Sequence, residues 1–105
     1  MPRDKVTEDE LQEHLRTHGE WSLHQGALRR EYVFPSFVTA FGFMTQVALI
    51  AERMNHHPEW TNVYNRVHVT LQTHDVGGLT ADDLALSAAM DGLAGHLPAP
   101  GSSSS

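Results

Sequence analysis

Hydrophobic residues between Phe37 and Met54 recur at intervals of three and four positions, which is the repeat of one face of an α-helix. They form two neighbouring stripes: Phe37, Phe41, Met44, Ala48 and Ala51 in the first, and Ala40, Phe43, Val47, Ile50 and Met54 in the second. At about 100° per residue, the two stripes cover more than half of the circumference, which is more than one sheet face needs. We therefore expect a central helix with a sheet on one side and a further partner, such as another subunit, on the other.

Two stretches with a two-residue period predict two antiparallel hairpins. The first is expected from Trp21 to Phe34, with its turn at Gln25-Gly26. The second is expected from Trp60 to Thr73, with its turn at Tyr64-Asn65. On the last strand, alternation puts Val67, Val69 and Leu71 on one face and His68, Thr70, Gln72 and His74 on the other.

Ser36 offers a cap for the central helix, and capping residues also predict a shorter helix at each end of the chain. Thr7 and Glu10 form the pattern of a capping box, and Gly19 is placed to end that helix in a left-handed conformation. Thr80 is followed by Asp82 and Asp83, whose charges favour the first turn of a last helix. Leu86, Met90, Leu93 and Leu97 then follow at helical spacing.

The order helix, hairpin, helix, hairpin, helix predicts an α+β fold, a four-stranded antiparallel sheet with three helices packed on one face. With 105 residues there is room for a single domain, which we assign to residues 1–97. Residues 98–105, rich in proline and serine, are expected to be a disordered tail.

Charge and composition exclude several kinds of partner. Thirteen acidic residues outnumber seven basic ones, and no basic cluster is present, so direct binding of nucleic acid is not expected. No apolar run approaches the roughly 20 residues that span a bilayer, and no apolar signal core follows Met1, so we expect no membrane association and a cytoplasmic location. The absence of cysteine excludes thiolate metal sites and thiol nucleophiles.

The most informative pattern begins at Glu52 and reads Glu-x3-His-His-Pro-x5-Tyr-x9-His-x8-Asp, ending at Asp83. At each position it resembles the signature of the pterin-4a-carbinolamine dehydratases, and the preceding Gly42-Phe43-Met44 is similar as well. Some relatives in this family double as dimerisation cofactors of a hepatocyte transcription factor. The order of predicted elements extends the resemblance over almost the whole chain except the serine tail.

The resemblance implies an enzyme that removes water from 4a-hydroxytetrahydropterin, giving quinonoid dihydropterin for an aromatic amino-acid hydroxylase. It implies a homodimer or homotetramer and no cofactor or metal, since the pterin is the substrate. Carried over residue by residue, it implies His56 and His74 as the acid and base, with His57 chiefly binding the hydroxylated edge of the pterin. The implied substrate-binding residues are Glu52, Pro58, Trp60 and Asp83, of which Asp83 orients a histidine or holds the pterin ring.

Elementary stereochemistry agrees with these roles. Pro58 disfavours helical geometry at His57, so the long helix should stop near Asn55 and pass both histidines to an extended segment. Adjacent extended side chains diverge, so the pair is poorly suited to grip one ion but can touch different edges of a planar ligand. Histidine, with an ordinary pKa of about 6.5, supplies both acid and base near neutral pH. We expect His56 and His74 to be exposed residues of one cleft.

Two other functions remain open at this stage. A metal-dependent hydrolase would use His56, His57 and His74 as ligands and would lose activity with chelators. A protein-interaction module would act through the wide apolar arc of the central helix. Each of the other histidines is expected to be a surface or structural residue, although His14 and His18, one turn apart, have a spacing that can bridge a metal: His14, His18, His24, His68 and His96.

Overall fold

The computed structural model describes residues 4–100, so the part of the predicted tail at 101–105 lies outside the described residues. The elements along the chain are α1 (Glu8–Thr17), β1 (Ser22–His24), β2 (Ala27–Val33), α2 (Phe37–Met54), β3 (Glu59–Val63), β4 (Arg66–Leu71), the 3₁₀-helix η1 (His74–Val76) and α3 (Ala81–Gly95). Apart from η1, this is the predicted order of helices and hairpins.

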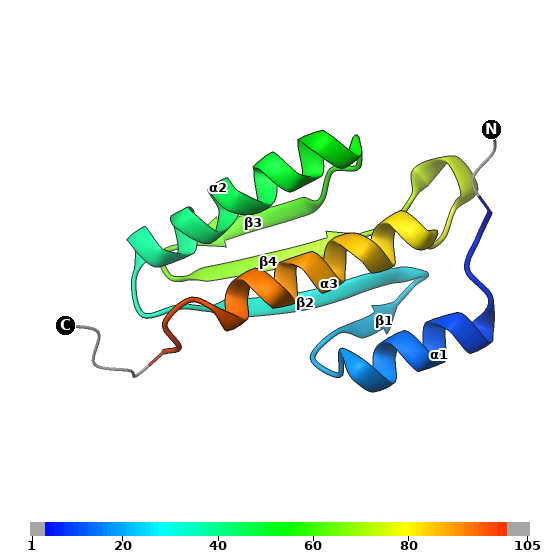
Figure 1. Ribbon diagram of the computed structural model, residues 1–105, viewed down its shortest axis with the longest axis horizontal. Coiled ribbons are helices and arrows are strands. Elements are labelled where there is room, and N and C mark those ends of the chain that lie inside the picture. Colours follow the sequence, from blue (N-terminus) through cyan, green and yellow to red (C-terminus); the bar gives the residue numbers. More distant parts are fainter. Residues whose placement is uncertain (1–3, 101–105) are drawn as a thin grey trace.

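The strands form one antiparallel sheet in the order β1-β2-β4-β3, so each predicted hairpin lies at an edge and the two hairpins meet at β2 and β4. The central pairing is in register from Leu28 opposite Leu71 to Val33 opposite Arg66. The helices α2 and α3 run across the same face of the sheet, and α1 lies beside β1 and contacts α3 through His14 and Ser87 (Figure 1). The predicted α+β fold is confirmed.

A single hydrophobic core fills the space between the sheet and the helices. The predicted face of β4 is buried, as is one of the two stripes of α2 for most of its length. The fully buried side chains include Leu28, Ala40, Phe43, Val47, Val67, Leu86 and Met90. The opposite sheet face carries polar side chains, so the sheet is covered by helices on one side, as its alternation predicts.

The N-cap predictions hold, but the predicted end of α1 is wrong. Thr7 and Glu10 form the reciprocal capping box, and the Ser36 hydroxyl caps α2. At the other end of α1 the capping residue is His18, with φ −128°, and Gly19 has no left-handed conformation. The last turn is closed instead by hydrogen bonds from His18 N to the His14 carbonyl and from Trp21 N to the His18 carbonyl.

The end of α2 and the end of β4 bring the predicted site residues together. Asn55 adopts the left-handed conformation (φ 52°) that asparagine tolerates, and it turns the chain sharply before His56. The strand β4 ends at Leu71, two residues earlier than expected, because the chain closes a tight loop between Thr73 and Gly78. His74 therefore lies in η1 and not on a strand.

Candidate active site

A pocket of about 330 Å³ lies where the end of α2 meets the segment that follows β4. The three histidines of the sequence motif line it together, although they come from two elements separated by a complete hairpin. The lining residues are Asn55, His56, His57, Gln72, Thr73, His74 and Asp75. This pocket is the candidate active site.

His56 is the buried member of the three, with 6% of its surface exposed. Its Nε2 lies 2.6 Å from Oδ1 of Asp83. A carboxylate oxygen accepts hydrogen bonds, so His56 Nε2 is the donor in this contact. The expectation that His56 is an exposed residue is therefore wrong: the turn at Asn55 directs its ring inward, toward the first turn of α3.

The carboxylate of Asp83 is completely buried and is held through both oxygens. While Oδ1 contacts His56, Oδ2 accepts hydrogen bonds from the Thr73 hydroxyl at 2.7 Å and from the Thr80 backbone N–H at 2.9 Å. The Thr80 hydroxyl lies 2.9 Å from that of Thr73. These contacts supply the hydrogen bonds that a buried carboxylate requires, and they place Asp83 beneath His56.

His57 differs from His56 in both burial and polar partner. Its side chain is 57% exposed, and its Nε2 lies 2.9 Å from Oε1 of Glu52 on the last turn of α2. The adjacent histidines therefore diverge, as the extended backbone before Pro58 predicts. Pro58, partly buried, follows them directly and leads into β3.

His74 is the most exposed of the three, at 68%. Its Nδ1 lies 3.2 Å from the Gln72 amide nitrogen, and its Nε2 lies 3.5 Å from Oε1 of Glu59 at the start of β3. The ring is thus held from both sides by side chains that remain in contact with solvent, which leaves it accessible to a ligand.

The predicted substrate-binding residues do not line the pocket: Glu52, Pro58, Trp60 and Asp83. Glu52 and Asp83 contact the histidines, whereas Trp60 pairs with Val69 across β3 and β4 and packs against the hydrophobic core. The sequence reasoning missed the lining residues Asn55, Gln72, Thr73 and Asp75. Asn55 and Thr73 directly precede motif histidines, and this position in the sequence could have identified them as site residues.

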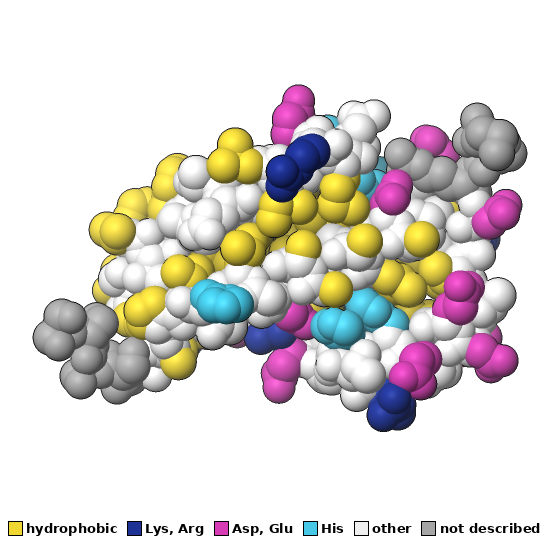
Figure 2. All heavy atoms as spheres, viewed as in Figure 1, with side chains coloured by type: hydrophobic (Ala, Val, Ile, Leu, Met, Phe, Trp, Pro, Cys, Tyr) yellow, Lys and Arg dark blue, Asp and Glu magenta, His cyan; other side chains and the backbone are white. Residues whose placement is uncertain are grey.

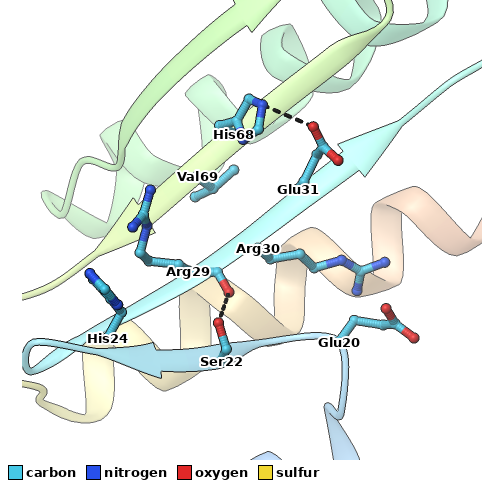
Figure 3. A pocket seen from close by; sticks show the side chains of 8 residues that line it. All are labelled: Glu20, Ser22, His24, Arg29, Arg30, Glu31, His68 and Val69. Atoms are coloured by element: carbon cyan, nitrogen blue, oxygen red, sulfur yellow. Dashed lines mark hydrogen bonds and ion pairs between the residues drawn. The ribbon is translucent and has the colours of Figure 1, made fainter.

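A second pocket, of about 280 Å³, lies between β1 and β2 on the uncovered side of the sheet (Figure 3). Acidic and basic side chains are interspersed in it, and His68 lies 2.9 Å from Glu31. His68 is exposed, as expected for a surface residue. The lining residues are Glu20, Ser22, His24, Arg29, Arg30, Glu31, His68 and Val69. Because it lacks a buried, oriented acid/base pair, it is the weaker candidate for a catalytic site.

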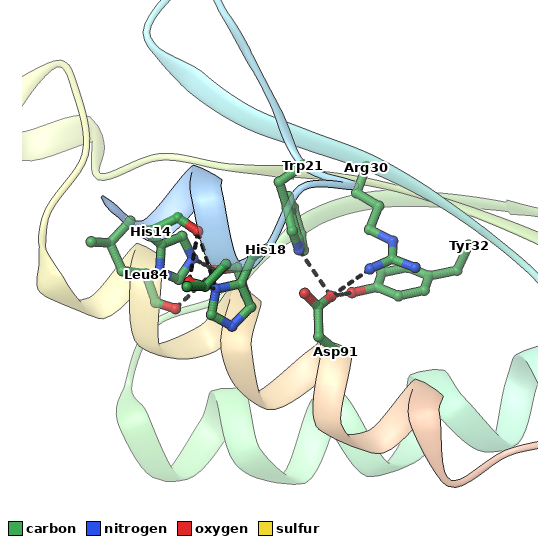
Figure 4. A network of polar contacts seen from close by, with 9 residues as sticks. His14, His18, Trp21, Arg30, Tyr32, Leu84 and Asp91 are labelled. Carbon is green, nitrogen blue, oxygen red and sulfur yellow. Dashed lines mark hydrogen bonds and ion pairs between the residues drawn. The ribbon is translucent and has the colours of Figure 1, made fainter. Parts of the chain in front are cut away.

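A polar network ties β1 and β2 to α3 (Figure 4). One oxygen of Asp91 accepts hydrogen bonds from Trp21 Nε1 at 2.9 Å, from Arg30 at 2.8 Å and from the Tyr32 hydroxyl. Burial, together with the Asp91 charge, raises the pKa of Tyr32 far above its usual range. Tyr32 is therefore a fixed donor, and we assign the network a structural role.

His14 and His18 are stacked on α1 with ring centroids 4.2 Å apart, beside α3 (Figure 4). Nε2 of His14 lies 2.7 Å from the Ser87 hydroxyl of α3. Within residues 4–100, no group of three or more histidine, cysteine or acidic side chains is placed to hold a metal ion. Over the same residues, no helix is long and apolar enough to cross a membrane.

Comparison with known proteins gives consistent results. The family model described as Pterin 4 alpha carbinolamine dehydratase matches residues 4–93. A protein of Solibacter usitatus, provisionally named pterin-4-alpha-carbinolamine dehydratase, is 56% identical over 90 residues, 86% of this chain and 95% of its own length. A relative from Brucella ovis with the same provisional name is 47% identical over 97 residues, 90% of this chain and all of its own.

A solved structure also matches the fold. The crystal structure described as transcriptional coactivator/pterin dehydratase from Brucella melitensis has a TM-score of 0.83 and 45% sequence identity. The match covers 87% of this chain and 99% of that one.

Proposed function

Because this chain belongs to the pterin 4 alpha carbinolamine dehydratase family, we propose that it removes water from a 4a-hydroxytetrahydropterin to give the quinonoid dihydropterin. The observation that carries the proposal is the pocket itself. The three histidines of the family motif line it together, and one of them is held by a buried carboxylate.

The reaction requires two proton transfers and one bond cleavage. The bond between C4a and the hydroxyl oxygen breaks, the hydroxyl leaves as water after receiving a proton, and the neighbouring ring nitrogen loses a proton. No electrons are transferred, so the chemistry requires no redox cofactor. Histidine acid and base groups contribute typically ~10²- to 10⁴-fold each, and we propose that they act here without a metal.

We propose that His56 and His74 are the acid/base pair and that His57 binds the hydroxylated edge of the pterin. The contact with Asp83 orients the His56 ring beside the pocket. The exposed ring of His74 can reach a ligand from the other side of the pocket. Glu52 supports this arrangement through its contact with His57.

The direct test follows the ultraviolet absorbance of freshly generated 4a-hydroxytetrahydropterin with and without the protein. Acceleration that persists after chelator treatment is the expected result. Acceleration that a chelator abolishes would favour the metal-dependent alternative, and no acceleration by the folded protein would overturn the proposal.

We also propose that the chain forms a homodimer or homotetramer through the outer face of α2. Large hydrophobic side chains are exposed on this face, which Figure 2 shows as a yellow edge over α2 at the upper left. They are Phe37, Val38, Phe41 and Leu49. A chain of 105 residues buries a small core, so coverage of this face would add stability.

The family also suggests biochemical partners. We propose that the hydroxylated pterin comes from an aromatic amino-acid hydroxylase and that the product returns to it after reduction. The Brucella melitensis structure is described as a transcriptional coactivator as well as a pterin dehydratase, and we propose that the outer face of α2 would serve any such second interaction in this chain. For this chain, such an interaction would compete with self-association for the same residues of α2.

A further inference from the structure

The two proposed acid/base histidines come from different parts of the chain, and one intervening side chain links them. His56 follows α2, whereas His74 begins η1. Thr73 directly precedes His74, and its hydroxyl bonds to the carboxylate that holds His56. We propose that Thr73, assisted by Thr80, is a positioning residue that aligns the two histidines through Asp83. This inference rests on the proposed dehydratase function.

The geometry of the carboxylate supports this role. Each oxygen of Asp83 has its own partners: Oδ1 faces His56 Nε2 at 2.6 Å, and Oδ2 faces the Thr73 hydroxyl at 2.7 Å and the Thr80 N–H at 2.9 Å. Asp83, Thr73 and Thr80 are each at most 3% exposed, so water does not replace a lost donor easily. The orientation of the carboxylate plane, and with it the His56 ring, depends on these contacts.

The direction of each hydrogen bond follows from the donors available. A carboxylate accepts only, so the single hydroxyl hydrogen of Thr73 points to Asp83. The Thr80 hydroxyl, 2.9 Å from that of Thr73, must then donate to it. The resulting chain runs from Thr80 to Thr73 to Asp83, and His56 donates to the other carboxylate oxygen. One arrangement of hydrogens therefore satisfies all four groups.

The backbone of Thr73 also helps to fix the position of His74. Thr73 N donates to the Gly78 carbonyl at 2.7 Å, which closes the loop that contains η1. The side chain of Thr73 thus anchors this loop to α3 through Asp83, directly before the exposed His74. Loss of the hydroxyl is expected to disturb the position of both histidines.

The decisive comparison is Thr73→Val against Thr73→Ser. Valine keeps the shape and β-branching but leaves Oδ2 of Asp83 with one donor fewer, whereas serine keeps the hydroxyl. The buried carboxylate then loses a hydrogen bond that holds its orientation, so we expect kcat to fall about 10-fold in the valine variant, with KM little changed. The serine variant should stay within about 3-fold of the wild type.

A matched control uses Thr61, which lies on the uncovered face of β3, away from the pocket. The variant Thr61→Val makes the same chemical change and should leave kcat unchanged. Thermal unfolding of all variants shows whether a lower kcat is caused by unfolding of the protein. If Thr73→Val fails to fold, Thr80→Val removes the next hydroxyl of the chain while retaining the backbone N–H that binds Asp83.

A second readout does not depend on activity. In ¹⁵N-correlated NMR spectra, His56 should appear as the Nε2–H form in the wild type and in Thr73→Ser. In Thr73→Val, or in Thr80→Val if needed, the His56 Nε2–H signal should shift and exchange faster with water. If these NMR changes are seen but the wild-type protein shows no dehydratase activity, the positioning role is retained and the proposed function is rejected. An unchanged His56 signal in the hydroxyl-free variant would overturn the inference.

Discussion

At the scale of single residues, burial separates the three histidines of one motif into two environments. His56 is enclosed and donates to a buried carboxylate, whereas His57 and His74 are more than half exposed beside acidic side chains that water also reaches. A buried ring held by a buried carboxylate has a fixed orientation, which suits the acid/base role that we propose for His56. The exposed side chains of His57 and His74 have room to change conformation when a ligand binds.

Replacement of His74 should separate catalysis from folding. Because the ring is 68% exposed, we expect His74→Ala to lower kcat by about 100-fold while the melting temperature stays within about 2 °C of the wild type. The control is His68→Ala, which removes a similarly exposed histidine from the uncovered sheet face. Turnover by absorbance and thermal unfolding measure both effects, and a loss of only a few-fold for His74→Ala would reject its assigned role.

In contrast to His74→Ala, removal of the Asp83 side chain should lower the stability of the fold. Asp83→Ala leaves the His56 N–H, the Thr73 hydroxyl and the Thr80 N–H without their buried acceptor, so the free energy of unfolding should fall by about 2–4 kcal/mol. Asp82→Ala is the matched control, since it lies in the same first turn of α3 and shares the helix-dipole effect. Urea denaturation measures the difference. Equal losses in the two variants would show that the buried contacts of Asp83 add nothing.

At the scale of elements, α1 docks on α3 through a contact that responds to pH. Partial burial and the neighbouring His18 lower the pKa of His14 below its ordinary value of 6.5, against an opposing effect of Asp91 on α3. His14 also contacts Ser87 of α3. The folded chain therefore favours the neutral ring, and the unfolded chain binds more protons at mildly acidic pH.

The sign of the pH effect follows from this difference. Since the folded pKa lies below 6.5, stability is independent of His14 well above pH 6.5 and falls as the pH drops below 6.5. The substitution His14→Gln removes the titrating group but keeps a side chain that can bond to Ser87. Melting temperatures from pH 8 to 5 should therefore fall less steeply in the variant. Parallel curves for variant and wild type would contradict the assignment.

At the scale of the whole molecule, the uncovered part of α2 is the main feature that a single chain leaves unexplained. Its inner stripe fills the core, but Val38 and Leu49 remain more than two-thirds exposed on the outer face. Contiguous exposed apolar surface is a feature of interaction sites. A second copy of the chain is the partner that we propose for this face.

Charge placed on this face should prevent assembly. We expect light scattering to give a dimer or tetramer for the wild type and a single chain of 11.7 kDa for the double variant Val38→Lys and Leu49→Lys. The control is Val63→Lys, which places the same charge on a similarly exposed valine at the end of β3. A wild-type protein that is already a single chain, or a double variant with unchanged mass, would refute the proposed interface.

Much of the fold could be predicted because its signals are local. The Thr7 cap, the Ser36 cap and the turn at Tyr64-Asn65 each depend on residues within about four positions. The failure at Gly19 has the same origin: glycine permits a left-handed helix end, but hydrogen bonds from Trp21 and His18 closed the helix without one. For the site, the expectation that His56 and His74 share one cleft agrees with the pocket that both of them line.

The sequence by itself determined the order of the elements, the buried face of each and the motif that marks the site, because periodicity and caps act over a few neighbouring residues. Only the tertiary structure decided that His56 is buried, that Asp83 holds it from 27 positions away and that Thr73 completes the contact. It also decided that His14 meets Ser87 of α3. Burial and pairing depend on which faces of distant elements meet, and no pattern within one element contains that information.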